Sequence, residues 1–189
     1  RVWAIIKAVS DDEDPTPEHE QKYGGDNMDP ATLSINTTRG EAMHTVIKYA
    51  LWCSRNLYPT KEEAAKVELK LVPEVQEILD RHLDPTIDPA LTIRAVYGWY
   101  LPNLFYLSKQ WVIKNLERIF PKDPNQRELW IAGWETYLSN NPYYDLFPVI
   151  KEEYRRSVSL LGTTSKKGHK YADLNELLPH HFMIVYAKD

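Results

Sequence analysis

Histidine and glutamate are the residues through which this chain would most readily bind a metal ion, but their spacing does not match a known pattern. No two of the six histidines stand four residues apart, so the chain lacks the His-Glu-x-x-His pattern of helical zinc sites. Glu41 and His44 form a single Glu-x-x-His, whereas a di-iron helical bundle needs two such pairs and two further glutamates. We therefore predict no metal site.

Nucleophilic catalysis would have to start from Cys53, the only cysteine, with His44 as its nearest same-helix base. On one helix the two residues lie on opposite sides and roughly 13 Å apart along the axis. A nucleophile and its base must lie within hydrogen-bond reach. Gly24 and Gly25 are not followed by the Lys-Ser/Thr of a phosphate-binding loop. We predict no catalytic residue and no cofactor, and we expect Cys53 to be a small core residue.

Charge is distributed unevenly along a chain whose net charge is −4. The first 30 residues hold 3 basic and 8 acidic side chains, whereas residues 151–170 hold 6 basic and 2 acidic ones. One interpretation is that the basic segment contacts an anion or a nucleic acid. The other, which we favour, is that its arginines complement the C-terminal end of their helix and that the following loop is only solvated. The candidate anion contacts are Arg155, Arg156, Lys166, Lys167 and Lys170.

Aromatic residues make up 12% of the chain and crowd into two segments, residues 97–111 and 130–144. Most of them are expected to fill the core, but they surround their helices so widely that some must reach the surface. Exposed aromatic side chains are typical of protein interfaces. If the chain has such an interface, we expect some of four residues to be exposed side by side: Trp99, Tyr106, Trp130 and Tyr143.

The elements that position these residues are predicted to be helices. Apolar residues recur at helical spacing in residues 2–9, again after Thr38, and near the end of the chain. Residues 10–37 are acidic and interrupted by proline and glycine, so we predict an irregular loop there. Two capping boxes, Thr38–Glu41 and Thr60–Glu63, are predicted to begin helices.

Two similar units follow one another in the middle of the chain. Asp88-Pro89 and Asp123-Pro124 each match a helix N-cap followed by proline, and they lie 35 residues apart. Gly98-Trp99 and Gly133-Trp134 have the same spacing. Such a period is typical of an α-solenoid, because stacked two-helix units bury apolar faces that one unit cannot bury alone. We predict an all-α fold, an α-solenoid-like stack of antiparallel helix pairs over residues 38–189; two unrelated hairpins are the alternative.

Residues 23–44, together with residues 49–52 and 95–104, resemble helical-repeat regions near the C-terminal end of very large bacterial proteins with an upstream ATP-binding module. Some of those proteins resemble signal-transducing NTPases of the defence type. The resemblance extends over residues 11–120 and implies a HEAT- or TPR-like sensor or scaffold arm. It implies no catalytic residue in this chain, because the NTPase chemistry would lie elsewhere in the parent protein.

We expect one helical-repeat domain over residues 1–189, cut from a larger protein because the chain begins with Arg1. Its expected function is non-catalytic: a protein-interaction, scaffold or sensor arm that binds another protein or another domain of its parent chain. A nucleic-acid-contacting arm is the alternative, and a small α-helical enzyme is the third. The single cysteine and the absence of a signal peptide favour the cytoplasm. The longest uncharged stretch, residues 95–108, is too short for a membrane span.

Overall fold

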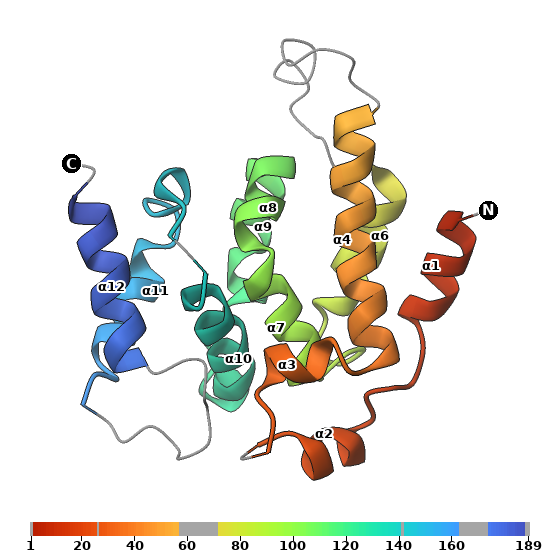
Figure 1. Cartoon of the computed structure of the whole chain (residues 1–189), viewed down its shortest axis with the longest axis horizontal. Coiled ribbons are helices and arrows are strands. Elements are labelled where there is room, and N and C mark those ends of the chain that lie inside the picture. Colours follow the sequence, from red (N-terminus) through yellow and green to blue (C-terminus); the bar gives the residue numbers. More distant parts are fainter. Residues whose placement is uncertain (1, 26, 57–71, 141, 163–173, 188–189) are drawn as a thin grey trace.

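The fold is helical throughout the part of the chain that the computed structural model describes (Figure 1). That part comprises residues 2–25, 27–56, 72–140, 142–162 and 174–187. The helices are α1 (Val2–Ser10), α2 (Pro17–Tyr23), α3 (Pro30–Ser34), α4 (Thr38–Asn56), α6 (Pro73–His82), α7 (Leu91–Trp99), α8 (Leu101–Leu107), α9 (Lys109–Ile119), α10 (Arg127–Leu138), α11 (Lys151–Val158) and α12 (Leu174–Tyr186), with 3-10 turns η1 (Pro124–Gln126) and η2 (Tyr144–Leu146).

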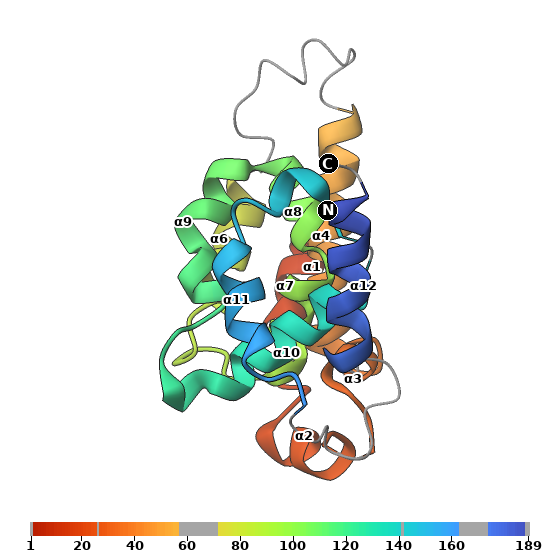
Figure 2. The same ribbon diagram turned by 90° about the vertical axis from the view of Figure 1, so that its left-hand side faces the viewer.

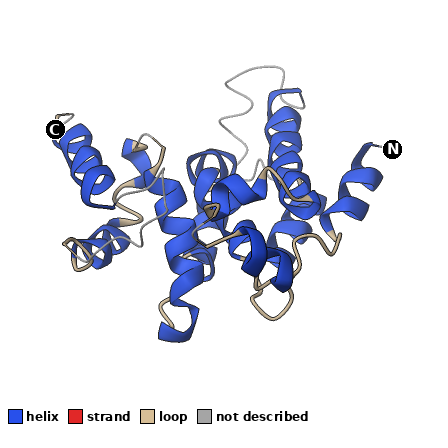
Figure 3. Cartoon of the chain, turned by 60° about the horizontal axis from the view of Figure 1, so that its bottom comes forward, coloured by secondary structure: helices blue, strands red, loops and turns tan. Residues whose placement is uncertain are grey.

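These helices follow the chain across the molecule, with α1 and α12 at opposite ends of the long axis (Figure 1). Helices α10, α11 and α12 lie together on the side that carries the C-terminus (Figure 2). The described residues contain no strand (Figure 3). The prediction of an all-α fold is therefore confirmed, whereas the stacking of antiparallel pairs stays a prediction.

Helix α7 lies in the middle of the fold and packs against α3, α4, α8, α9 and α10. Residues 92–98 are all buried, as expected of a helix with neighbours on every side. Its closest approach is to α10: a Cβ atom placed on Gly98 would lie 2.8 Å from the carbonyl carbon of Gly133, with the carbonyl oxygen nearer still. The two glycines whose spacing suggests a repeat thus face each other in one helix–helix contact.

The residues beside these glycines have different surroundings in the two units. Trp134 is buried, whereas Trp99 is exposed. Asp123 caps η1, because its Oδ1 accepts a hydrogen bond from the N–H of Asn125 at 2.9 Å. The two units are therefore alike in sequence but not in the environment of their tryptophans.

Asp88 does not cap a helix, which corrects the sequence-based prediction. Helix α7 begins at Leu91, and the carboxylate of Asp88 is buried beneath it. Its Oδ2 lies 2.7 Å from Nδ1 of His82 and 3.2 Å from Nε of Arg39. The carboxylate is thus held by a histidine from α6 and an arginine from α4, which belong to two different helices.

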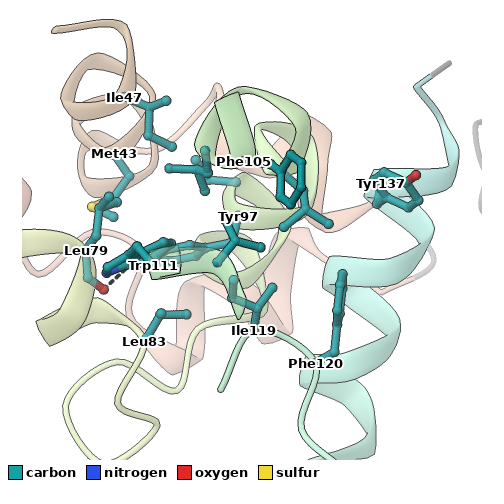
Figure 4. Packing of buried hydrophobic residues seen from close by; sticks show 14 of the residues in the cluster. Met43, Ile47, Leu79, Leu83, Tyr97, Phe105, Trp111, Ile119, Phe120 and Tyr137 are labelled. Atoms are coloured by element: carbon teal, nitrogen blue, oxygen red, sulfur yellow. Dashed lines mark hydrogen bonds between the residues drawn. The ribbon is translucent and has the colours of Figure 1, made fainter. Parts of the chain in front are cut away.

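The core is one cluster of buried side chains that extends from Ile6 in α1 to Leu178 in α12. Figure 4 shows Leu79, Tyr97 and Trp111 packed together in part of this cluster. The hydroxyl of Tyr97 donates to the carbonyl oxygen of Leu79 at 2.7 Å, so this large side chain is buried without an unpaired polar group. Cys53 is buried, as predicted.

Residues 10–37 are not an irregular loop, because they contain α2 and α3. Both helices begin with an N-cap followed by proline: Thr16 accepts from the N–H of His19, and Asp29 accepts from the N–H of Thr32. Thr16-Pro17 and Asp29-Pro30 carry the same signal that indicates a helix start at Asp123-Pro124. The prediction is wrong because helices of 7 and 5 residues are too short to show a periodic spacing of apolar residues.

The acidic side chains of this segment bind the N-termini of other helices. Glu20 in α2 accepts hydrogen bonds at the start of α7, from the N–H of Leu91 at 3.2 Å and of Thr92 at 2.7 Å. The first N–H groups of a helix have no partner within the helix, and a carboxylate there also meets the positive end of the helix dipole. Glu20 thus supplies the cap that Asp88 was predicted to supply.

Asp14 caps the N-terminus of α4 in the same way. Its Oδ2 accepts from the N–H of Thr38 at 2.8 Å, and its backbone carbonyl accepts from the N–H of Arg39 at 2.7 Å. Thr38 is already the first residue of the helix, and the N–H of Glu41 donates to the carbonyl of Thr37. The predicted capping box at Thr38–Glu41 is therefore wrong, and the one at Thr60–Glu63 lies outside the described residues.

Candidate partner-binding hollow

Two residues predicted to bind different partners, Trp130 and Arg156, bind each other instead. Trp130 is only 1% exposed, and its indole N–H donates to the Glu153 carboxylate at 2.6 Å. The guanidinium of Arg156 lies 4.1 Å from the centre of the Trp130 ring and donates to the carbonyl of Pro121 at 2.8 Å. Because a cation stacked on an indole stabilises both groups, Trp130 is part of the core and Arg156 covers it. The prediction of Trp130 as an exposed contact is wrong.

Of the other candidate anion contacts, only Arg155 lies in the part of the chain that the structure describes. Arg155 is exposed and forms an ion pair with Glu152 one turn earlier in α11. Lys166, Lys167 and Lys170 lie outside the described residues. Within residues 151–162, therefore, both arginines have acidic neighbours on their own helix. This agrees with the interpretation that the basic segment binds no nucleic acid.

Three of the four predicted aromatic contacts are exposed: Trp99 by 37%, Tyr106 by 50% and Tyr143 by 38%. Tyr143 packs edge-on against Phe105, with ring centroids 6.3 Å apart. Burial raises the pKa of Tyr143, and the charge of Asp145 and its hydrogen bond to Tyr143 add to this effect. Trp99 stands at the end of α7 and lines a separate hollow.

That hollow has a volume of about 350 Å³ and lies between α3, the end of α7 and the last turns of α10. A volume of this size is at the lower end of the range for ligand sites in proteins. The lining residues are Asp29, Pro30, Ala31, Thr32, Trp99, Ala132, Glu135, Thr136, Ser139 and Asn140. Two acidic residues and one tryptophan are among these ten, and none of the ten is basic.

The polar groups around the hollow are held in place by local hydrogen bonds. The carboxylate of Asp29 accepts from the N–H of Thr32 at 2.9 Å and from its hydroxyl at 2.6 Å. In the last turn of α10, Ser139 and Asn140 both donate to the carbonyl of Thr136, at 2.7 and 3.0 Å. The polar side chains at these two helix ends are thus fixed by hydrogen bonds within their own helices.

A serine and a histidine lie behind the hollow at the distance expected of a nucleophile and its base. Oγ of Ser34 is 2.8 Å from Nε2 of His44, and Nδ1 of His44 is 3.2 Å from the hydroxyl of Tyr100. Sequence reasoning missed this pair, because Ser34 and His44 belong to different helices and no spacing rule connects them. Trp99, which lines the hollow, packs edge-on against His44, with ring centroids 5.4 Å apart.

This arrangement does not activate the serine. The Ser34 hydroxyl donates to the carbonyl of Ala31 at 2.6 Å, so Nε2 of His44 carries the proton and donates to Ser34. Nδ1 then accepts from Tyr100. Ser34 and His44 are both buried, and burial, with a smaller effect of Lys48, lowers the pKa of His44 to about 4. A histidine that donates to a serine cannot accept its proton, so the three groups join α3, α4 and the start of α8 structurally.

A second buried histidine connects α12 to the rest of the fold. Nε2 of His181 lies 3.0 Å from the carbonyl of Leu138 and 2.7 Å from that of Asn140. These carbonyls can only accept, so Nε2 carries the proton and Nδ1 accepts from the hydroxyl of Tyr154 at 2.8 Å. Burial lowers the pKa of His181, although the two carbonyls act in the opposite direction. This network also has a structural role.

Comparisons with known proteins identify no relative: no protein-family model, no curated protein and no solved structure matches the chain. None of the described helices has the length and apolar character needed to cross a membrane. In the described ranges, no three or more His, Cys, Asp or Glu side chains come together in a way that could hold a metal ion.

Proposed function

We propose that this chain is a non-catalytic protein-binding arm and that the hollow beside Trp99 is part of its binding face. The observation that supports this most directly is an exposed tryptophan that lines a hollow between three helices. Tryptophan is enriched among the residues that contribute most to protein binding, because it offers a large contact area with few rotatable bonds. Tyr106 and Tyr143 are two further exposed aromatic side chains.

The proposal agrees with the resemblance to helical-repeat arms of large bacterial proteins. In that setting the arm would be a stack of antiparallel helix pairs in the cytoplasm. It would bind another protein or another domain of its parent chain. Because helical-repeat proteins bind through extended surfaces, the hollow would hold one part of a longer contact.

A peptide-display selection tests the proposal even while the partner is unidentified. Peptides are selected on the wild-type chain, and each is then measured against Trp99→Ala and against Trp52→Ala. Trp52 is a matched control, since it is an exposed tryptophan on α4 that does not line the hollow. We expect the peptides to lose about 10-fold or more in affinity for Trp99→Ala and to bind Trp52→Ala unchanged. No enrichment, or equal loss in both variants, would contradict the proposal.

The alternative, an arm that contacts nucleic acid, predicts a different dependence on salt. Binding through phosphates weakens steeply as salt concentration rises, because counterions are released on binding. We expect little binding of the chain to DNA or RNA at physiological salt, since both described arginines of the basic segment have acidic neighbours. Tight binding with a steep salt dependence, reduced by replacing Lys166, Lys167 and Lys170, would favour the alternative.

A further inference from the structure

We infer that two copies of this chain bind each other end to end, with the outer face of α12 in one copy against the outer face of α1 in the next. The outer face of α1 is formed by Val2 and Ile5, and that of α12 by Met183 and Tyr186. The inference goes beyond the proposed function, because it concerns the two end helices and not the hollow beside Trp99.

The most exposed large hydrophobic side chains of the described residues lie on these two helices. Val2 and Ile5 are each 65% exposed, and Met183 and Tyr186 are 71% and 83% exposed. The members of each pair stand three residues apart, so they lie next to each other on one face of their helix. Hydrophobic side chains that gather in this way at a surface are typical of an interaction site.

Helix α1 is apolar on more sides than the fold covers. It packs against α4 through a side that includes the buried Ile6, whereas Ala4 and Ala8 are exposed. Lys7, the one charged side chain of this helix, forms an ion pair with Glu77 of α6 at 3.0 Å. A helix that is apolar all round is normally buried on every side. The outer face of α1 is therefore suited to contact with another apolar surface.

The positions of the two helices make a second copy a suitable partner. Helices α1 and α12 lie at opposite ends of the long axis, so their outer faces cannot cover each other within one molecule (Figure 1). A second copy placed end to end brings them together. The faces also differ in shape, because α12 presents long side chains and α1 presents shorter ones between its exposed alanines. Bulky side chains of one helix pack best into the shallow surface of another.

The charges beside the end helices favour contact between unlike ends. The first 30 residues, which include α1, hold 8 acidic and 3 basic side chains, whereas residues 151–170 hold 6 basic and 2 acidic ones. Helix α11 belongs to this basic segment and packs against α12. Contact of α12 with α1 therefore brings a basic segment near an acidic one. Contact of α1 with α1, or of α12 with α12, would bring like charges together.

A contact between two different faces leaves one face of each kind free at the ends of the pair. Assembly then continues into longer chains of copies, unless the rotation between neighbours closes a ring. The faces are small, so we expect a weak contact with a dissociation constant of about 10 μM to 1 mM.

Analytical ultracentrifugation of the full chain over a range of concentrations tests the inference. We expect the mass of the wild type to rise with concentration beyond that of a dimer. Ile5→Glu and Met183→Glu are each expected to weaken self-association about 10-fold or more, because the new carboxylate would be buried against apolar side chains. Ile113→Glu is the matched control, since Ile113 lies on α9, is 50% exposed and belongs to neither face. It is expected to assemble like the wild type, and circular dichroism checks that every variant is folded.

A mixture of the two end variants tests which faces meet. The Ile5→Glu chain keeps its α12 face and the Met183→Glu chain keeps its α1 face, so an equimolar mixture is expected to form a dimer and nothing larger. A wild type that stays monomeric at about 1 mM would overturn the inference. So would a mixture that stays monomeric, a Met183→Glu chain that associates as strongly as the wild type, or an equal loss in Ile113→Glu. Peptides that depend on Trp99 are expected to bind both end variants unchanged, so the outcome here is independent of the proposed function.

Discussion

Replacing Gly98 with alanine is expected to disrupt the contact between α7 and α10. The added methyl carbon would lie 2.8 Å from the carbonyl carbon of Gly133 and 3.1 Å from its Cα. Favourable contacts between carbon atoms begin at about 3.5 Å, so the helices would have to separate by roughly 1 Å. The obstacle is backbone, which cannot rotate out of the way as a side chain can.

The expected loss of stability follows from two opposing effects. Alanine in place of glycine inside a helix stabilises the chain by up to about 1 kcal/mol. Overfilling a packed interior typically costs about 1–3 kcal/mol, and more where no side chain can move. The separation would also loosen Tyr97 and Trp134, which are fully buried beside this contact. We expect a net loss of about 3 kcal/mol, a large share of the roughly 5–15 kcal/mol that stabilises a typical domain.

Gly133→Ala is the matched control, because it adds the same methyl group to the other side of the contact. Its Cβ would lie 3.4 Å from Cε1 of Phe120 and 3.5 Å from Cγ of Arg94, which are ordinary distances. Only the gain in helix propensity remains, so its stability is expected to be unchanged or raised by up to about 1 kcal/mol.

Urea denaturation followed by circular dichroism measures both variants. With a slope of about 2 kcal/mol/M, the loss for Gly98→Ala corresponds to a midpoint lower by roughly 1.5 M. Absence of a cooperative transition in Gly98→Ala, with a normal transition in Gly133→Ala, would agree with the same reasoning. Equal midpoints for the two variants, or a Gly98→Ala chain as stable as the wild type, would refute it.

Three further predictions concern the cap formed by Glu20, the buried His44 and the cation stacked on Trp130. Glu20→Gln is expected to cost about 1 kcal/mol in urea denaturation, because it weakens the cap of α7, whereas Glu13→Gln at an exposed position before α2 should have no such effect. Because burial lowers the pKa of His44 from 6.5 to about 4, its contribution to stability is complete above pH 6.5 and is lost as the pH falls towards 4. The loss amounts to at most about 3 kcal/mol, and His44→Gln should flatten the dependence of stability on pH over this range. Arg156→Ala should cost about 1–2 kcal/mol, since it uncovers the ring of a buried tryptophan, whereas Arg155→Ala should leave the denaturation midpoint unchanged; equal midpoints for the two would contradict the stacking.

The candidate site could be predicted only in part. Exposed aromatic residues were expected from their number, and Trp99, Tyr106 and Tyr143 are exposed. Nothing in the sequence separates Trp99 from Trp130, since both lie in aromatic-rich helical segments. The difference arises because Trp130 faces Glu153 and Arg156 across a helix contact, whereas Trp99 ends its helix beside a hollow.

The hollow itself depends on three helices that are far apart in the chain. Asp29 caps α3, Trp99 ends α7 and Glu135 belongs to α10. No spacing in the sequence places these residues together. Their meeting depends on the close approach of α7 and α10 at Gly98, which sets how the end of one helix lies against the last turn of the other.

The sequence by itself determined that the fold is helical, and it carries helix starts at Thr16-Pro17 and Asp29-Pro30 that the prediction of a loop overlooked. The periodic spacing of apolar residues, the N-cap residues and the prolines all act within about four residues along the chain, through hydrogen bonds and side-chain directions. These signals can therefore be recognised in the local sequence. Only the tertiary structure decided which partner each charge binds. Asp14 and Glu20 bind N–H groups 24 and 71 residues later in the chain, and Ser34 meets His44 across two helices. Such contacts depend on how the helices pack, because a carboxylate binds whichever N–H group or cation the fold brings within reach.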